Sequence, residues 1–416
     1  MTGGPIVVVG GGVGGAAAVA ELRRSGFAGA ITLVCGEPTV PYERPPLSKA
    51  FLLDPATGDG AVHPRDWYDE HDVDLRLGTV ATALDPVART VTLSDGETVP
   101  YDRLLLATGV RARTLPGVAG PGVHQLRTVD DAVALRAALE AAAHVAVLGG
   151  GFVGCEVAAA AVRLGRRVTL LESLPTVLYR ALGGELGGVV GDIHRGAGVD
   201  VRTGRTVTAV APGPNGVTIT TDEGRLDCDV LVVGVGSVPN QEVAQAAGIT
   251  VEDGILVDEF CATSAPGVYA VGDVARQYLP AHGRRIRVEH HDSAIRQART
   301  AARNMLGADE PFTDVHWFWS DQYEHSIQSA GVADPDGELV VRGSLADRDF
   351  SAFRLDGDRV GSVVSLDRPR DVLDTRRLIA REHSVTADQL RDETTPIKRL
   401  GAPPRAALKL LKGRRR

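Results

Sequence analysis

Short runs of uninterrupted apolar residues alternate with alanine-rich helical patterns along most of the chain. Residues 6–9 and 145–148 form two such runs, and neither alternates as a strand with one face in water would. A helical pattern follows each run, near 14–25 in the first case. A second apolar run then follows, near 31–35 in the first unit and 167–171 in the second. These strand–helix–strand units predict an α/β fold built on parallel sheets.

The turn between strand and helix has the same glycine spacing in both units. It is Gly10-x-Gly12-x-x-Gly15 in the first and Gly149-x-Gly151-x-x-Gly154 in the second. In such turns the first glycine permits a tight bend, the second lets backbone approach a pyrophosphate, and the third lets helix and strand pack closely. The helix N-terminus then faces the phosphates.

An acidic residue follows the second apolar run of each unit. Glu37 lies twenty-two positions after Gly15, and Glu172 lies eighteen positions after Gly154. A carboxylate at this place accepts a hydrogen bond from a ribose hydroxyl of a bound dinucleotide. Two complete copies of the pattern predict that the chain binds two dinucleotides and passes electrons between them.

Alternating patterns of apolar and polar residues occur inside the two units and again in the C-terminal part of the chain. Inside the units, segments near 73–93 and 207–219 predict small antiparallel excursions from the parallel sheets. After Trp317-Phe318-Trp319, the segments 338–342 and 350–366 predict antiparallel strands, and helical patterns follow near 370–381 and 386–392. This last part carries no nucleotide-binding motif and is predicted to be an α+β domain.

The two dinucleotide units are expected to be nested. The apolar run that ends at Gly109 and a later one at 268–271 are both expected to be strands of the first sheet. The second unit, which lies between them in the sequence, can then be inserted into the first. We therefore predict an α/β protein with two Rossmann-like domains and a C-terminal α+β domain. The expected parts are an FAD-type domain (1–110 and 241–316), an NAD-type domain (111–240), the C-terminal domain (317–400) and a basic tail (401–416).

Composition and charge narrow the class of protein. The 416 residues are 44% hydrophobic and 24% charged, as in globular proteins, and the net charge is −8. Residues 397–416 nevertheless carry eight basic residues and no acid. The four cysteines (Cys35, Cys155, Cys228 and Cys261) form no CxxC pair, which argues against a zinc site, a disulfide framework and a redox-active dithiol. We expect no bound metal, no signal peptide, no membrane span and a cytoplasmic location.

Further motifs follow the glycine turns in a recognisable order: Ala107-Thr108-Gly109, Gly234-x-Gly236-x-x-Pro239-Asn240 and Gly272-Asp273. This order resembles the two-dinucleotide flavoprotein reductases, whose fold is glutathione-reductase-like. Two loops, Tyr42-Glu43-Arg44-Pro45-Pro46-Leu47-Ser48-Lys49 and Phe318-Trp319-Ser320-Asp321-Gln322-Tyr323, narrow the resemblance. They are similar to the putidaredoxin reductase and rhodocoxin reductase group, over the chain up to about residue 395. Members of that group are NADH-dependent, FAD-containing ferredoxin reductases of cytochrome P450 and aromatic ring-hydroxylating systems.

The resemblance implies that the first turn holds FAD, with Glu37 on the adenosine ribose. It also implies that Arg44 and Lys49 contact the flavin and that Asp273 contacts the ribityl chain. Two alternatives are that Arg44 and Lys49 are ordinary surface charges and that Asp273 is only a helix N-cap. The residues expected around FAD are Gly10, Gly12, Val13, Gly14, Gly15, Glu37, Arg44, Lys49, Ala107, Thr108, Gly109, Gly272, Asp273, Glu289, His290, His291 and Trp319. Gly236 is expected to bind a cofactor without being assigned to one of the two.

By the same resemblance, the second turn holds the nicotinamide nucleotide. Glu172 would bind both ribose hydroxyls of NAD and repel the 2′-phosphate of NADP, so NADH is expected to be preferred over NADPH. Glu156 is expected near the nicotinamide, paired with Lys49, although an acid near a helix N-terminus is also favoured by the helix dipole alone. The NAD-site residues are Gly149, Gly151, Phe152, Val153, Gly154, Glu156 and Glu172.

His291 departs from the family pattern, because relatives often carry an aromatic residue, commonly tryptophan, at this place. It is expected to stack on or hydrogen-bond the flavin and to bring a titratable group to it. Trp319 matches a family tryptophan and either covers the flavin, lies beside the electron exit, or only packs in a core. Lys49, Glu156, His291 and Trp319 are therefore the candidate catalytic residues.

The expected mechanism is hydride transfer from NADH to FAD, followed by single-electron transfer to a [2Fe–2S] or [3Fe–4S] ferredoxin. A cytochrome P450 or a dioxygenase would be the indirect partner. Residues 42–49 lack the cysteine that disulfide-reducing relatives carry, which argues against thiol chemistry. Two arginine groups are candidates for binding an acidic ferredoxin: Arg284, Arg285 and Arg287, and Arg368, Arg370, Arg376 and Arg377. Each group could also be an ordinary solvated face.

The basic tail leaves two other functions open. As an amphipathic helix on an anionic membrane it would suit an NADH:quinone reductase, but a disordered end is the simpler interpretation. A flavoprotein of the apoptosis-inducing-factor kind, whose redox state governs interaction, is the second alternative. Nucleic-acid binding is not expected, because only the tail favours it.

Overall fold

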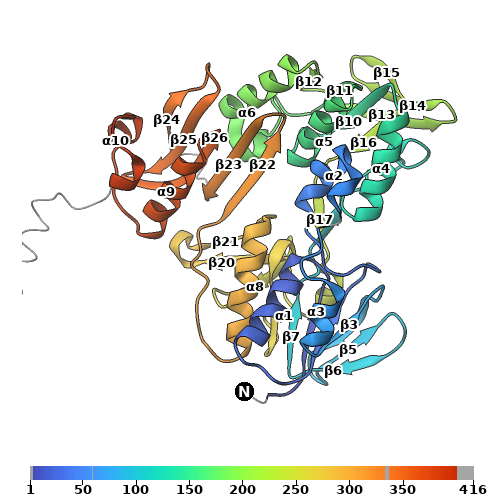
Figure 1. The fold of residues 1–416 in the computed structure, drawn as a ribbon, viewed down its shortest axis with the longest axis vertical. Helices are drawn as coiled ribbons and strands as arrows, with labels where there is room; N and C mark the ends of the chain where they lie inside the picture. The colour runs from blue at the N-terminus through green and yellow to red at the C-terminus, as the bar shows by residue number, and fades with distance from the viewer. Residues whose placement is uncertain (1–2, 59, 333–336, 401–416) are drawn as a thin grey trace, which may run out of the picture. The chain divides into compact units, whose positions relative to one another are not determined.

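A computed structural model describes residues 3–58, 60–332 and 337–400 of the chain (Figure 1). The chain divides into two compact units, Met1–Asp314 and Val315–Arg416. The basic tail 401–416 lies outside the described residues. In the described part, no helix combines the length and the apolar character needed to cross a membrane.

The first sheet of unit 1 is five-stranded and entirely parallel. Its order is β19 (Val268–Ala270), β7 (Arg103–Leu106), β1 (Ile6–Val9), β2 (Ile31–Val34), β3 (Val73–Arg76). Helices α1 (Val13–Arg24) and α8 (His291–Met305) pack side by side (Figure 1). Short elements complete this half: η1 (Pro45–Ser48), α2 (Ala50–Leu53), η2 (Pro55–Thr57), α3 (Arg65–Glu70) and η3 (Gly272–Val274).

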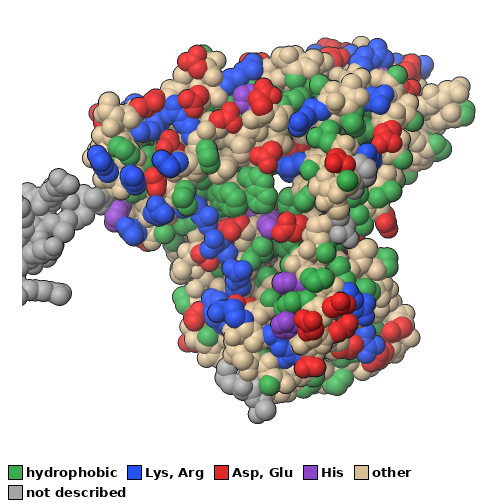
Figure 2. Space-filling view, in the orientation of Figure 1, with side chains coloured by type: hydrophobic (Ala, Val, Ile, Leu, Met, Phe, Trp, Pro, Cys, Tyr) green, Lys and Arg blue, Asp and Glu red, His purple; other side chains and the backbone are tan. Residues whose placement is uncertain are grey.

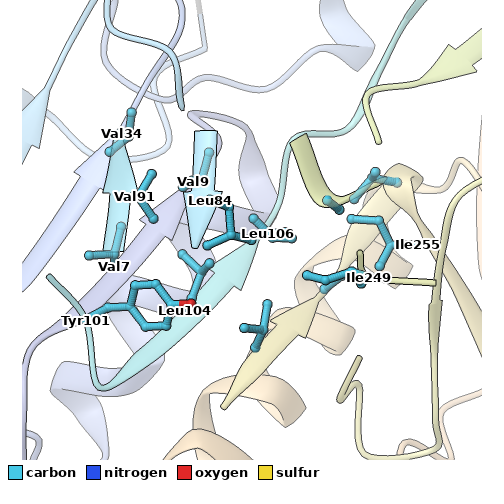
Figure 3. Close-up of a cluster of buried hydrophobic side chains, with 14 of the residues drawn as sticks. Val7, Val9, Val34, Leu84, Val91, Tyr101, Leu104, Leu106, Ile249 and Ile255 are labelled. Atoms are coloured by element: carbon cyan, nitrogen blue, oxygen red, sulfur yellow. The ribbon is translucent and has the colours of Figure 1, made fainter. Parts of the chain in front are cut away.

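The apolar residues of this sheet form a continuous core (Figure 3). Val7, Val9, Leu104 and Leu106 from neighbouring strands are at most 5% exposed, and Ile255 from a smaller sheet joins them. Because the inner strands β1 and β7 are covered on both faces, their sequences show uninterrupted apolar runs rather than alternation.

The second sheet of unit 1 is also five-stranded and parallel. Its order is β12 (Asp200–Arg202), β11 (Arg167–Leu171), β10 (His144–Leu148), β16 (Val230–Val233), β9 (Val123–His124). Its helices are α4 (Val129–Ala141), α5 (Phe152–Arg163) and α6 (Tyr179–Gly196). An antiparallel sheet of β13 (Val207–Gly213), β14 (Gly216–Thr221) and β15 (Gly224–Cys228) adjoins it.

Two antiparallel strands carry the chain out of the first sheet and back again. They are β8 (Val110–Ala112), which follows β7, and β17 (Ser237–Pro239), which follows β16. The Thr108 hydroxyl donates to the Asn240 carbonyl at 2.7 Å, and the Asn240 amide donates to the Thr108 carbonyl at 2.9 Å. Because β19 returns to the first sheet after this crossing, the second nucleotide-binding sheet is inserted into the first. The predicted fold class is confirmed.

One expectation about the first half needs correction. Residues 73–76 do not belong to an antiparallel excursion; they form β3, the parallel edge strand of the first sheet. The excursion consists of β4 (Ala81–Asp85), β5 (Thr90–Leu93) and β6 (Thr98–Pro100). An edge strand is half exposed, so β3 alternates between buried and exposed positions and mimics an antiparallel pattern. A small sheet of β18 (Ile255–Val257), β20 (Ala275–Leu279) and β21 (Arg284–Ile286), with α7 (Glu242–Ala246) and η4 (Pro280–His282), completes unit 1.

Unit 2 is an antiparallel sheet with helices, as the sequence predicts. The strand order is β22 (Trp317–Gln322), β23 (His325–Gly331), β26 (Arg359–Leu366), β25 (Asp349–Asp356), β24 (Glu338–Ser344). Helices α9 (Pro369–Ala380) and α10 (Ala387–Arg391) and η5 (Ile397–Arg399) complete it. Val340, Phe353, Val363, Val372 and Leu390 are fully buried in one core that joins sheet and helices.

Candidate functional site

The helices after the two glycine turns begin without the usual side-chain caps. The N-cap residues are Gly12 for α1 and Gly151 for α5; neither helix has a side-chain cap bond or an acid in its first turn. Helix α4, by contrast, begins with a Thr128–Asp131 capping box. The first backbone N–H groups of a helix have no intrahelical partner, and the helix dipole favours an anion beside them. Both turns therefore offer a site for a phosphate.

The glycines of the first turn differ in what requires them. A Cβ on Gly10 would lie 2.1 Å from the Ala107 carbonyl oxygen, and one on Gly15 would lie 2.0 Å from the Gly10 carbonyl oxygen. A Cβ on Gly12, or on Gly151 in the second turn, would meet no protein atom within 4 Å. Packing thus accounts for the outer glycines but not for the middle ones. The open space over each middle glycine fits a dinucleotide pyrophosphate.

The two acidic residues are held differently. Glu172 follows β11 directly, and its carboxylate accepts hydrogen bonds from the backbone N–H of Gly150 at 2.7 Å and of Leu174 at 2.8 Å. The residue that follows β2 in the same way is Cys35, and a Cβ on Gly11 would contact its side chain at 2.8 Å. Glu37 lies two residues further along the chain. The two nucleotide sites therefore differ at this position.

Glu37 is paired with residues of the proline-rich loop. Its carboxylate accepts hydrogen bonds from the Tyr42 hydroxyl at 2.5 Å and from the Arg44 guanidinium at 2.6 Å. Arg44 also donates to the Arg127 carbonyl at 2.6 Å. Burial raises the pKa of the Tyr42 hydroxyl, so Tyr42 remains a neutral donor. Arg44 is thus neutralised by Glu37 rather than exposed as a lone surface charge.

Arg127 was not predicted from the sequence, although it meets the predicted residue Asp273. Its guanidinium and the Asp273 carboxylate are 3.0 Å apart. Its Nε is buried, and no hydrogen-bond partner for this atom occurs in the described part of the chain. Arg127 also lies against Gly109, since a Cβ there would be 3.3 Å from the guanidinium. A buried donor without a partner fits a bound ligand.

A buried ion pair joins the proline-rich loop to helix α5. The Lys49 ammonium lies 2.8 Å from Oε2 of Glu156, and their side chains are 17% and 5% exposed. The Ser48 hydroxyl, also buried, donates a hydrogen bond to the same oxygen. The structure thus brings together Lys49 and Glu156, which are more than one hundred positions apart. Ser48 is a further participant that the sequence did not reveal.

The residues Glu289, His290 and His291 lie at the N-terminus of α8. Glu289 accepts a hydrogen bond from Ser237 and pairs with Arg287 at 2.7 Å. Nε2 of His291 lies 3.5 Å from the Glu43 carboxylate of the proline-rich loop. Burial lowers the pKa of His290 to about 4, so this imidazole is neutral at pH 7.

Thiol chemistry has no suitable group in this chain. All four cysteines are free and buried. Burial raises their thiol pKa values, to about 12 for Cys35 and Cys261, so they carry no reactive thiolate at pH 7. Among the described residues, no cluster of three His, Cys, Asp or Glu side chains could hold a metal ion.

Trp319 lies in unit 2, on strand β22. Its ring stacks on Trp317 with centroids 5.1 Å apart and an interplanar angle of 19°. The Arg376 guanidinium lies 5.8 Å from the centre of the Trp317 ring. Trp317 packs against the core of unit 2, whereas Trp319 is partly exposed.

Comparison with known proteins agrees with these observations. Residues 4–303 match the model of the pyridine nucleotide-disulphide oxidoreductase family, and residues 317–401 match that of the reductase C-terminal family. The chain is 41% identical, over 96% of its length and 99% of the relative's, to the ferredoxin–NAD+ reductase component of an anthranilate 1,2-dioxygenase system from Burkholderia cepacia. It is 38% identical to putidaredoxin reductase from Pseudomonas putida, over 97% of this chain and 98% of the relative.

Solved structures show the same similarity. The reductase in a covalent putidaredoxin reductase–putidaredoxin complex aligns with a TM-score of 0.92 and 38% identity, over 96% of this chain and 98% of that one. A ferredoxin reductase from Rhodopseudomonas palustris aligns with a TM-score of 0.91 and 34% identity, over 95% of this chain and 99% of that one.

Proposed function

The chain belongs to the pyridine nucleotide-disulphide oxidoreductase family, and within it to the ferredoxin reductases. We therefore propose that each of its two glycine turns binds one cofactor and that electrons pass from one cofactor to the other. The protein is a flavoprotein that takes electrons from NADH and delivers them to a ferredoxin. Bound FAD supplies the conversion between a two-electron donor and a one-electron acceptor. The observation that carries the proposal is the pair of uncapped helix N-termini, each facing open space over its middle glycine.

The first turn, Gly10 to Gly15, is proposed to hold the FAD pyrophosphate. Arg127 and Asp273 form an ion pair, and the buried Nε of Arg127 has no hydrogen-bond partner among the described residues. This pair would orient the ribityl chain of FAD, which lies beyond the phosphates. Glu37 and Arg44 form an ion pair, so they would contact the cofactor as a pair with no net charge rather than as two separate charges.

The second turn, Gly149 to Gly154, is proposed to hold NADH. Glu172 is fixed by two backbone N–H groups in a position suited to accept from ribose hydroxyls. The same negative charge would repel a 2′-phosphate, and this repulsion accounts for the proposed preference for NADH over NADPH.

Lys49 and Glu156 are proposed to lie where the two cofactors meet, because the ion pair joins the loop of the first sheet to the helix after the second turn. The ammonium group can stabilise negative charge that develops on the electron acceptor, and burial strengthens that interaction. His291 and Trp319 remain candidates for contact with the flavin. Since every cysteine is buried as a thiol, electrons leave to a protein carrier rather than to a disulfide.

The proposed docking surface for an acidic ferredoxin is smaller than the sequence suggested. Arg287, Arg368 and Arg377 are each paired with carboxylates. Arg284 and Arg285 of β21 are exposed, as is Arg370 of α9, and none of the three pairs with a carboxylate in the described part of the chain. Figure 2 shows basic side chains gathered over β20 and β21 of unit 1. Arg284 and Arg285 are adjacent on one strand, and we therefore favour them as the docking residues.

The terminal partner is proposed to be a cytochrome P450 or a ring-hydroxylating dioxygenase, since relatives named for both kinds of system match the chain. A cytoplasmic location is part of the proposal and suits four reduced cysteines. The test is steady-state reduction of a panel of [2Fe–2S] and [3Fe–4S] ferredoxins by purified protein and NADH. One FAD per chain and rapid turnover with at least one ferredoxin are expected. Rapid quinone reduction without ferredoxin activity would refute the proposal.

A further inference from the structure

Ser48 lies where the loop of the first nucleotide-binding sheet meets the helix that begins the second. It is the last residue of η1 and is only 6% exposed. Its hydroxyl donates to Oε2 of Glu156 on α5. Tyr42 and Leu47 of the same loop and Phe51 of α2 pack with Ala132 of α4 in one small apolar cluster. Ser48 thus makes a buried polar contact between the two halves of unit 1, next to the Lys49–Glu156 ion pair.

The same carboxylate oxygen accepts from two donors. Besides the Ser48 hydroxyl, Oε2 of Glu156 lies 2.8 Å from the Lys49 ammonium. The other polar partner of that ammonium is the Pro45 carbonyl at 3.3 Å, longer than an ordinary hydrogen bond. The position of the Lys49 ammonium therefore depends mainly on the position of the Glu156 carboxylate. The lysine side chain is long and flexible, whereas the Ser48 side chain is short and buried, so the hydroxyl restricts the carboxylate more closely than the ammonium does.

We propose that Ser48 is a positioning residue: its hydroxyl fixes the Glu156 carboxylate, which in turn fixes the Lys49 ammonium. The inference rests on the proposed function, in which Lys49 and Glu156 lie where NADH and FAD meet. Ser48 acts through Glu156 and contacts neither cofactor. Removing the hydroxyl should leave NADH binding intact but misplace the ammonium during electron transfer.

The test compares Ser48→Ala with Ser48→Thr in the FAD-loaded protein by stopped-flow reduction with NADH. Ser48→Ala should be about tenfold slower at saturating NADH, with an unchanged half-saturating NADH concentration. Ser48→Thr keeps the hydroxyl and should retain most of the rate. A matched control is Ser365→Ala, since Ser365 is fully buried in unit 2 and its hydroxyl has no hydrogen-bond partner among the described residues. The control should react like the unmodified protein.

A double-mutant cycle with Glu156→Gln shows whether Ser48 acts through Glu156. In that background, Ser48→Ala should cause little further loss of rate, and the two changes should be non-additive in thermal unfolding of the cofactor-free protein. Full additivity in both readouts, or a Ser48→Ala enzyme as fast as the unmodified one, would overturn the inference. If the unmodified protein is not reduced by NADH at all, the proposed function fails, and with it the role of Ser48 in the reaction. The unfolding cycle then shows only whether the bridge exists.

Discussion

The Glu172 carboxylate accepts a hydrogen bond from the backbone N–H of Gly150, with a distance of 2.7 Å. Gly150 lies inside the second glycine turn, so the acid and the proposed phosphate site are parts of one local structure. A second backbone N–H, from Leu174, fixes the other carboxylate oxygen at 2.8 Å. Glu172 therefore presents its charge in a fixed direction, which is the geometry that discrimination between NADH and NADPH requires.

Replacing Glu172 with alanine should reduce that discrimination. Loss of charge-assisted hydrogen bonds to the ribose and of repulsion toward a 2′-phosphate should lower the ratio of kcat/KM for NADH over NADPH by about 10- to 100-fold. Steady-state kinetics with both nucleotides measures the ratio. Glu185→Ala removes an exposed acid from α6 and should leave the ratio unchanged. An unchanged ratio in Glu172→Ala would show that Glu172 does not select the cofactor.

The middle glycines allow the two cofactor sites to be tested separately. The added methyl groups of Gly12→Ala and Gly151→Ala meet no protein atom, so both variants should fold in the cofactor-free state, with a Tm lowered slightly because alanine is a poorer N-cap than glycine. Gly12→Ala should weaken FAD binding and Gly151→Ala only NADH binding, because an added methyl group fills the proposed phosphate space. Fluorescence titration measures both affinities. If Gly12→Ala bound FAD normally, the first turn would not be the phosphate site.

Lys49→Met should slow flavin reduction while FAD stays bound. The loss of a buried positive charge near the developing negative charge should cost at least about tenfold in the rate. Anaerobic stopped-flow absorbance with NADH provides the measurement. Lys398→Met removes an exposed lysine of η5 and serves as the control. A Lys49→Met enzyme that is reduced at the normal rate would contradict the proposed position of this residue.

His290 makes the protein less stable in acid. Its pKa falls from 6.5 to about 4 on folding because burial disfavours the charged imidazole. Below pH 6.5 the unfolded chain takes up a proton that the folded protein does not, so folding stability falls as the pH drops toward 4. The loss should reach up to about 3 kcal/mol. Thermal unfolding of the unmodified protein and of His290→Asn across this pH range should show a smaller pH dependence in the variant. Equal pH dependence would contradict the buried, neutral state of His290.

Charge reversal at β21 should weaken ferredoxin docking. Arg284→Glu and Arg285→Glu should each raise the KM for an acidic ferredoxin by about 3- to 10-fold at low salt and reduce its dependence on ionic strength. Turnover with ferricyanide, a small acceptor that needs no docking surface, should not change. Arg359→Glu alters an exposed arginine of unit 2 that is paired with Glu382, and it should have no effect on KM. If this control and the β21 variants raised KM equally, the docking surface would not be specific to β21.

Local sequence patterns were sufficient to predict most elements of both units. Helices expected near 14–25 and 370–381 each lie within one residue of that place. The glycine turns mark the starts of the two helices α1 and α5, and α9 has an apolar periodicity that indicates one buried face. The edge strand β3 was misassigned because half-burial produces alternation in parallel and antiparallel strands alike.

The contacts that complete the site could not be predicted in this way. Arg127 meets Asp273 across 146 positions, and Ser48 meets Glu156 across 108. Such pairs form only when two sheets come together, and no local pattern encodes them. The same limit applies to Glu37. Its spacing from the glycine turn suggested that it is equivalent to Glu172, but the residue directly after strand β2 is Cys35, whereas the residue directly after β11 is Glu172. The domain boundaries and the cofactor contacts proposed for individual residues remain predictions.

An anaerobic double-mixing experiment tests most directly whether electrons pass from NADH through FAD to a ferredoxin. The FAD-loaded protein is first mixed with one equivalent of NADH, and the reduced protein is then mixed with an oxidised [2Fe–2S] ferredoxin that it turns over. We expect rapid loss of flavin absorbance in the first step, much slower loss with NADPH, and reduction of two ferredoxins per flavin in the second. Slow reduction by NADH, or reduced flavin that does not transfer electrons to the ferredoxin, would contradict this path of electron transfer.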